Sequence, residues 1–276
     1  MHVVSRDLAS YPLRPHRAGV SWFIDHACPA EEFAEVMNAN EVERAVLVQA
    51  MGAYTDDNRY CVDAANADPR RFTAVVYLDL TERRVDPADP ADALARWVSA
   101  GATGVRVVAG TGDGMPRLTD QVVSQLIEGA VHLDVPVLLT TTAAALADLP
   151  PVLDRFDDVP VAIDHCAFPD LGGGPPYLRA RPLFELAAVP KVHLKISTNA
   201  LDRTTAAGGD PRDFVSALAE TFGPERLQWG SDWSQTHDRP YSELVAYARR
   251  AFAILPEDAR RSVESGAAQG FWRWNA

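Results

Sequence analysis

Short apolar runs alternate with stretches of helical periodicity along almost the whole chain. The eight runs have the length and composition of buried strands and lie at residues 1–5, 44–49, 72–79, 104–109, 136–141, 160–165, 192–197 and 227–232. Strict alternation of strand and helix implies a parallel sheet, because each crossover returns the chain to the same end. Eight such units in 276 residues predict one α/β domain over residues 1–276, folded as a single closed (β/α)8 or TIM barrel.

The intervening stretches carry apolar residues at helical spacing. They predict helices at residues 30–40, 57–67, 91–100, 119–133, 143–156, 179–188, 211–222 and 241–254, followed by two short extra C-terminal helices at 256–263 and 267–274. Pro150 and Pro151 are expected to break or restart the fifth of these helices. Asp210 before Pro211 is typical of a helix cap followed by a first-turn proline.

Composition limits the classes of partner. The formal net charge is −12, which argues against nucleic-acid binding because that function needs a basic face. Small-molecule substrates are the expected partners, and a homodimer is compatible with the sequence. No apolar run approaches the roughly 20 residues that cross a bilayer, and the N-terminus has no signal-peptide core. We therefore expect a soluble, cytoplasmic protein without membrane partners.

The three cysteines are widely spaced and form no C-x-x-C pattern, which fits a reducing compartment. Cys166 directly follows His165 and could be mistaken for a nucleophile. We interpret it as a small buried residue, because free cysteine is among the most buried residue types.

Two of the predicted strands end in side chains that carry chemistry. The strand at 227–232 ends in Asp232, and the strand at 160–165 ends in His165. Because the carboxyl ends of barrel strands share one rim, these two side chains should face each other. Other polar residues predicted at that rim are His2, Gln49, Arg106, Thr140, Thr141, Lys195, Ser197, Ser234, Gln235 and His237.

Each of these side chains has a functional and a structural interpretation. Asp232 is predicted to be the catalytic base that activates water, although it could also cap a turn. His165 is predicted to polarise a carbonyl, although it could be a hydrogen-bonded core residue. Arg106 can hold a substrate carboxylate through two hydrogen bonds or serve as an ion-pair partner. For Lys195 we expect structural pairing, because an inward lysine in a packed barrel needs an acidic partner.

Loops supply further candidates for substrate binding. His237 follows the last predicted strand, and Tyr54 follows the second. His16 and His26 lie in the long first loop, which could form a lid.

The motifs together resemble the amidohydrolase-related family of metal-dependent TIM-barrel hydrolases, in particular its lactonase branch. The matching segments run nearly from end to end, and the most specific is Gly230-Ser231-Asp232-Trp233. Others are Gly101-Ala102-Thr103-Gly104-Val105-Arg106, Ile163-Asp164-His165 and Val192-His193-Leu194-Lys195-Ile196-Ser197.

The resemblance implies a metal site built from an H-x-H pair, a histidine of a later strand and the strand-eight aspartate. Carried over, the ligands are His2, His165 and Asp232, while the first histidine of the pair would precede Met1. Three such ligands plus water suit a catalytic zinc. Many relatives have a further histidine where this chain has Thr140 and Thr141, and some lactonases of the family work without metal. A divalent metal, zinc first, and a metal-free site therefore both remain open.

By resemblance, the predicted activity is hydrolysis of a small, carboxylated lactone or related cyclic ester or amide by Asp-activated water. One alternative is a metal-dependent decarboxylase of an unsaturated or aromatic acid. Another is a catalytically degenerate barrel that serves as a binding or biosynthetic accessory protein, for which the incomplete H-x-H pair is the support. Ser234 replaces the proline that commonly follows the Gly-Ser-Asp-Trp motif, so the substrate's identity does not transfer.

Overall fold

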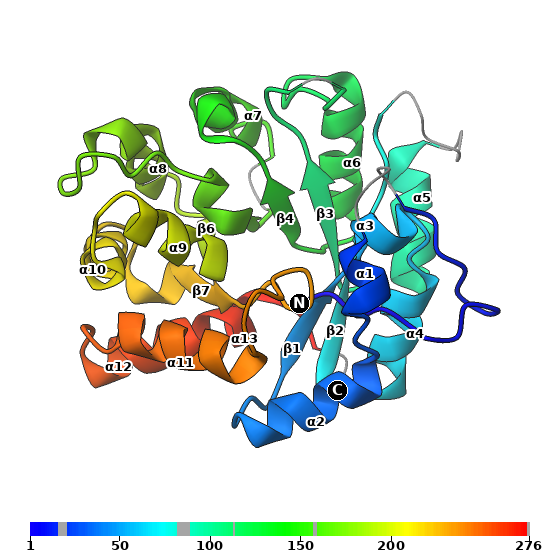
Figure 1. The fold of residues 1–276 in the computed structure, drawn as a ribbon. Helices are drawn as coiled ribbons and strands as arrows, with labels where there is room; N and C mark the ends of the chain where they lie inside the picture. Colours follow the sequence, from blue (N-terminus) through cyan, green and yellow to red (C-terminus); the bar gives the residue numbers. More distant parts are fainter. Residues whose placement is uncertain (16–20, 82–88, 113, 157–158, 275–276) are drawn as a thin grey trace.

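A computed structural model describes residues 1–15, 21–81, 89–112, 114–156 and 159–274. Seven parallel strands follow one another in chain order within a single curved sheet (Figure 1). They are β1 (Ala45–Val48), β2 (Phe72–Tyr77), β3 (Gly104–Val108), β4 (Val137–Thr140), β5 (Val161–Ile163), β6 (Val192–Ser197) and β7 (Leu227–Gly230). This α/β architecture agrees with the parallel sheet that the alternation predicted.

Helices cover the convex face of the sheet (Figure 1). The α-helices of the described residues are α1 (Trp22–Asp25), α2 (Ala30–Ala39), α3 (Met51–Tyr54), α4 (Arg59–Ala67), α5 (Pro90–Ser99), α6 (Gln121–His132), α7 (Leu149–Leu153), α8 (Arg181–Glu185), α9 (Thr198–Ala206), α10 (Pro211–Phe222), α11 (Tyr241–Phe252), α12 (Glu257–Arg261) and α13 (Ala267–Phe271).

The predicted strand at residues 1–5 does not form a strand, so the described residues contain seven strands rather than eight. The start of the chain nevertheless lies beside β1. The α-amino group of Met1 donates to the carbonyl of Val46 (3.0 Å), and the Val48 N–H donates to the carbonyl of Met1 (2.8 Å). Two bonds to a single residue align the segment with β1 without extending into a ladder. They are sufficient to place His2 next to the end of β1.

Local signals set several helix boundaries where the sequence indicated. The carboxylate of Asp210 accepts the Arg212 N–H at the start of α10, and Pro211 occupies the first turn. Pro150 and Pro151 lie in the first turn of α7, so the predicted helix at 143–156 is a 3₁₀ segment (Ala143–Asp148) that restarts as α7. The prolines fit there because a first-turn residue needs no N–H partner within the helix.

The C-terminal segment packs against the sheet at the end opposite His2. Trp272 is buried with Val75 and Leu138, and its indole N–H donates to the side-chain oxygen of Gln228 on β7 (2.8 Å). This contact places an aromatic side chain at the amino-terminal end of the strands.

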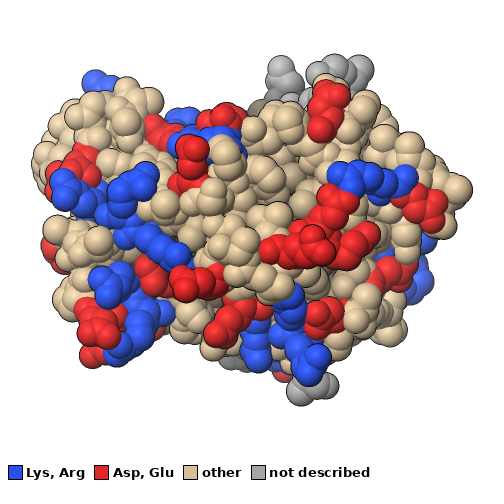
Figure 2. All heavy atoms as spheres, turned by 60° about the horizontal axis from the view of Figure 1, so that its bottom comes forward, with Lys and Arg blue, Asp and Glu red and all other residues tan. Residues whose placement is uncertain are grey.

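The surface carries charges of both signs. On the face that Figure 2 shows, Lys and Arg side chains are interspersed with Asp and Glu. Among the described residues, no helix is both long and apolar enough to span a bilayer.

Candidate active site

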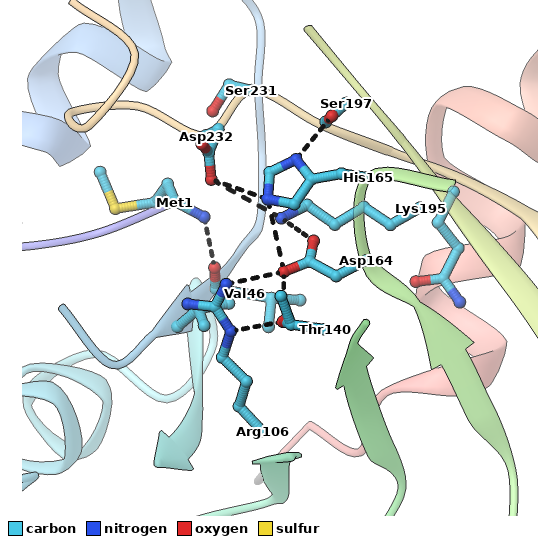
Figure 3. A network of polar contacts seen from close by, with 12 residues as sticks. Met1, Val46, Arg106, Thr140, Asp164, His165, Lys195, Ser197, Ser231 and Asp232 are labelled. Atoms are coloured by element: carbon cyan, nitrogen blue, oxygen red, sulfur yellow. Dashed lines mark hydrogen bonds and ion pairs between the residues drawn. The ribbon is translucent and has the colours of Figure 1, made fainter. Parts of the chain in front are cut away.

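Asp164, at the end of β5, is the centre of a buried polar network (Figure 3). One of its oxygens accepts hydrogen bonds from Arg106 (3.0 Å) and Thr140 (3.0 Å), and the other forms an ion pair with Nζ of Lys195 (2.8 Å). Burial by itself would raise the pKa of Asp164, but the charges of Lys195, Arg106 and, at the acidic pH where Asp164 titrates, protonated His165 outweigh it and hold the pKa well below its usual value. Asp164 is therefore a permanent anion in this site.

The backbone after β5 turns left-handed for four consecutive non-glycine residues. The φ angles of His165, Cys166, Ala167 and Phe168 are 53°, 50°, 58° and 53°. Neighbouring residues of a strand point to opposite faces, so Asp164 and His165 could not otherwise enter one site together. The left-handed turn brings both side chains to the same rim, at a cost of about 1 kcal/mol or more per residue. Such strain is typical of functional positions.

Asp232 faces two imidazoles. Its Oδ1 lies 3.2 Å from Nε2 of His2 and 3.9 Å from Nε2 of His165, and all three residues are buried. Burial alone would raise the pKa of Asp232, yet at the acidic pH where this carboxyl titrates, the hydrogen bond from protonated His2 and the charges of protonated His165 and of Lys195 lower the pKa well below its usual value. The carboxylate is thus ionised at neutral pH. The predicted meeting of His165 and Asp232 at one rim is what the structure shows.

The tautomer of His2 follows from its partners. Its Nδ1 lies 2.9 Å from the carbonyl of Val48, which can only accept, so Nδ1 carries a proton. Burial lowers the pKa of His2, although Asp232 opposes the shift. In the neutral ring Nε2 carries a lone pair, so its 3.2 Å contact with Oδ1 of ionised Asp232 becomes a hydrogen bond only when a proton lies between the two atoms. The space between these two atoms is a ready position for one proton.

His165 is oriented by Ser197 at the end of β6. Ser197 caps α9 by accepting the Ala200 N–H (3.3 Å), which leaves its hydroxyl hydrogen free for Nδ1 of His165 (2.8 Å). We therefore assign the ring proton of neutral His165 to Nε2. Burial lowers the pKa of His165, with Asp164 opposing the shift, so the ring is neutral at neutral pH.

Arg106 lies in the network but is not a free substrate clamp. Its Nε donates to Thr140 (2.8 Å), and its Nη2 donates to Asp164 (3.0 Å). The ion pair with Asp164 is present, and the substrate contact predicted for Arg106 stays a prediction. Among the described residues, its Nη1 donates to no protein acceptor.

Among the described residues, the loop candidates form no hydrogen bond or ion pair with this network. His26 and His237 are exposed and stack on each other, with ring centroids 4.1 Å apart. Tyr54 is buried, and its hydroxyl accepts the Ser5 N–H (2.8 Å), which anchors the first loop. His16 is outside the described residues.

The chain was compared with known proteins. A family model described as Amidohydrolase matches residues 1–274. The chain belongs to the amidohydrolase family. The match spans nearly its whole length, so the strand-end residues described above are all included.

Named relatives of this amidohydrolase act on lactones. The L-fucono-1,5-lactonase of Burkholderia ambifaria is 28% identical over 253 residues, which cover 88% of this chain and 84% of the relative. The 4-sulfomuconolactone hydrolase of Rhizobium radiobacter is 26% identical over 212 residues, covering 74% and 66%. A Pseudomonas putida structure described as a 2-pyrone-4,6-dicarboxylic acid hydrolase superposes with a TM-score of 0.75 at 27% identity, covering 98% of this chain and 94% of that one.

The predicted metal ligands of the amidohydrolase do not fit a resident divalent ion as they are arranged. The imidazoles of His2 and His165 converge on one oxygen of Asp232, and the described residues contain no set of three ligands around a common point. Nζ of Lys195 lies only 3.9 Å from the same oxygen. Two unit charges about 4 Å apart interact by roughly 4 kcal/mol at an effective dielectric of about 20, so the ammonium would strongly repel a dication. The anions Asp164 and Asp232 already balance Lys195 and Arg106.

Sequence reasoning missed part of this site. Asp164 was not singled out, because strand alternation assigned the inward direction to His165 alone. The signal for it was Lys195, which was expected to have an acidic partner within the barrel. The predicted rim included Thr140 and Ser197 but gave neither a role, and the structure uses both as hydrogen-bonding supports.

Proposed function

We propose that this amidohydrolase opens a small lactone by hydrolysis, with Asp232 as the base that activates water. The observation that carries the proposal is the convergence of His2 and His165 on Oδ1 of Asp232. A proton acceptor and an N–H donor thus lie side by side, as ester hydrolysis requires. The names of the relatives support a lactone, and two of the three describe anionic substrates, which supports a carboxylated one.

The base acts as a pair. A carboxylate with a very low pKa is a weak base on its own. Here a proton taken from water can be held between Oδ1 of Asp232 and the lone pair of Nε2 of His2. The second acceptor compensates for the weak basicity of the first.

His165 is placed to stabilise the charge that develops on the substrate. Its Nε2 lies 3.5 Å from Asp164 and 3.9 Å from Asp232, beyond a normal N–H···O distance, so the N–H can turn to a carbonyl oxygen. Water oxygen adds to the lactone carbon, and the carbonyl oxygen gains charge beside Nε2. The ring C–O bond then breaks, and the ring oxygen takes the proton held by Asp232 and His2. The product is an open hydroxy acid.

Arg106 supplies a contact for an anionic group. Its Nη1 is the guanidinium nitrogen without a hydrogen bond among the described residues. We assign to it a single hydrogen bond with the substrate carboxylate, in place of the two-bond clamp that the sequence suggested. All steps use the chain's own side chains.

An assay of Asp232→Asn tests the proposed reaction. Wild-type protein should convert at least one member of a panel of sugar lactones and carboxylated unsaturated lactones, with one proton released per turnover and no CO2. Asp232→Asn should lower kcat by about 10²–10⁴-fold, because general base catalysis has that magnitude. Asp238→Asn is the matched control, since Asp238 is an exposed residue of the same loop. Full activity of Asp232→Asn on that lactone would remove Asp232 from the mechanism.

A further inference from the structure

The side chain of Lys195 reaches between the two buried carboxylates. Its Nζ pairs with Oδ1 of Asp164 at 2.8 Å and lies 3.9 Å from Oδ1 of Asp232. Only 11% of the side chain is exposed, so water screens these interactions weakly. Lys195 is therefore the cation shared by both acids.

The absence of a side chain at Gly230 leaves space for Lys195 to reach this position. A Cβ built on Gly230 would overlap Cε of Lys195 and would lie 3.1 Å from its Cδ and Cγ. The lysine thus runs directly against the backbone of β7, and a side chain at position 230 would displace it. This overlap explains the glycine of the Gly230-Ser231-Asp232-Trp233 motif. A larger residue at position 230 would occupy the space of the lysine side chain from the neighbouring strand.

The groups around this ammonium have the chemistry of metal ligands. The carboxylates of Asp164 and Asp232 and Nε2 of His2 are oxygen and nitrogen donors of the kind that zinc accepts, and Nε2 of His165 becomes one when the ring changes tautomer. Nε2 of His2 already carries its lone pair toward Asp232, because Nδ1 donates to a backbone carbonyl. Such a backbone contact is the usual support of a metal-binding histidine.

We propose that the ammonium group of Lys195 takes the place of a divalent cation in this centre, and that its charge keeps a metal out and holds the surrounding side chains away from a common point. Lys195 is then a positioning residue, which acts through Asp164 and Asp232. The inference rests on the site of the proposed lactonase, but its main test uses no substrate.

Replacing the charge should convert the site into a metal site. Lys195→Met keeps most of the side-chain volume and removes the ammonium group. After exposure to zinc and dialysis, we expect the variant to retain about one zinc per chain by plasma mass spectrometry. Its zinc affinity, measured by competition with a chromophoric chelator, should exceed that of wild type by about 100-fold or more, because a unit charge a few ångströms from the ion has gone.

Lys191→Met is the matched control. It is the other lysine of the chain, and its Nζ donates to the carbonyls of Leu153 and Phe156 away from the site. This variant should behave as wild type. Gly230→Ala should also gain zinc binding, because the added methyl group displaces the Lys195 side chain without removing it. This variant provides the test if Lys195→Met does not fold. Equal zinc affinity in wild type and in the folded variants would overturn the proposal.

Chemical rescue separates this inference from the lactonase proposal. Lys195→Ala should lose most of its lactonase activity and recover part of it with added ethylammonium, which a purely structural lysine would not show. Absence of rescue in a folded variant would count against the positioning role. If wild type hydrolyses no lactone at all, the proposed function fails, while the zinc measurement still decides the role of Lys195.

Discussion

At the scale of single residues, Asp164 and His165 show what sequence can and cannot reveal about a site. The position of His165 at a strand end was sufficient to predict that it faces Asp232. The role of Asp164 could not be predicted, because two neighbouring residues of an ideal strand point to opposite faces. Only the left-handed φ of His165, 53°, places both in one site. No residue type in that segment signals such a turn, since glycine is absent from it.

Asp164→Asn should be strongly destabilising. The amide leaves the buried charges of Arg106 and Lys195 without an anionic partner close to both, and breaking one side of a buried ion pair costs about 3–5 kcal/mol. Urea denaturation gives the free energy of unfolding. Asp170→Asn, which alters an exposed pair with Arg179, should change it by less than about 0.5 kcal/mol. Near-wild-type stability of Asp164→Asn would show that Asp164 is not the anion of the network.

At the scale of one element, β6 carries the polar residues His193, Lys195 and Ser197 at alternate positions. The sequence predicted this shared face, and the three side chains contact successive levels of the barrel. His193 packs on Phe271 near the amino-terminal end, Lys195 pairs with Asp164, and Ser197 supports His165. The alternation could be predicted because a strand has a fixed period of two residues. The partners could not, since they come from other strands.

The half-buried His193 and the buried His2 and His165 predict a loss of stability in mild acid. Burial, with a smaller effect of the Arg226 charge, lowers the pKa of His193 to about 4, below its ordinary 6.5. A base whose pKa is lower in the folded state binds fewer protons there than in the unfolded state between those pH values. Stability is therefore fully present above pH 6.5 and falls as pH drops toward 4. Burial shifts His2 and His165 in the same direction.

Urea denaturation at pH 7 and pH 5 checks this dependence. The free energy of unfolding should be lower at pH 5, and His193→Gln should narrow the difference because glutamine takes up no proton. Stability that rises between pH 7 and pH 5 would mean that the sign of the histidine shifts is wrong.

At the scale of the whole molecule, the predicted parallel α/β architecture is confirmed, whereas the eighth strand of the predicted closed barrel is not formed among the described residues. Alternating periodicity located β1 to β7 to within a few residues. The predicted strand at 1–5 has the composition of a strand, but only Met1 forms backbone hydrogen bonds with β1 there. A strand is defined by its neighbours as well as by its residues, and the sequence alone does not show them.

Trp272 lies at the opposite end, and its removal should affect stability without changing the chemistry. Trp272→Ala loses a buried indole and the hydrogen bond to Gln228, which should cost about 3–5 kcal/mol. Trp274→Ala, at a half-buried position, should cost less. Differential scanning calorimetry and kcat of the folded protein measure the two effects. A large fall in kcat at unchanged stability would place Trp272 in the catalytic machinery.

The four-residue left-handed segment has a consequence for tolerance to mutation. A saturation scan over His165, Cys166, Ala167 and Phe168 should accept glycine at Ala167 more readily than valine or isoleucine, although the position is buried and apolar. Hydrophobicity, which ranks substitutions well elsewhere in a protein interior, would rank them in the wrong order here. The substitutions tolerated at this bend would then be determined by the backbone conformation and not by burial.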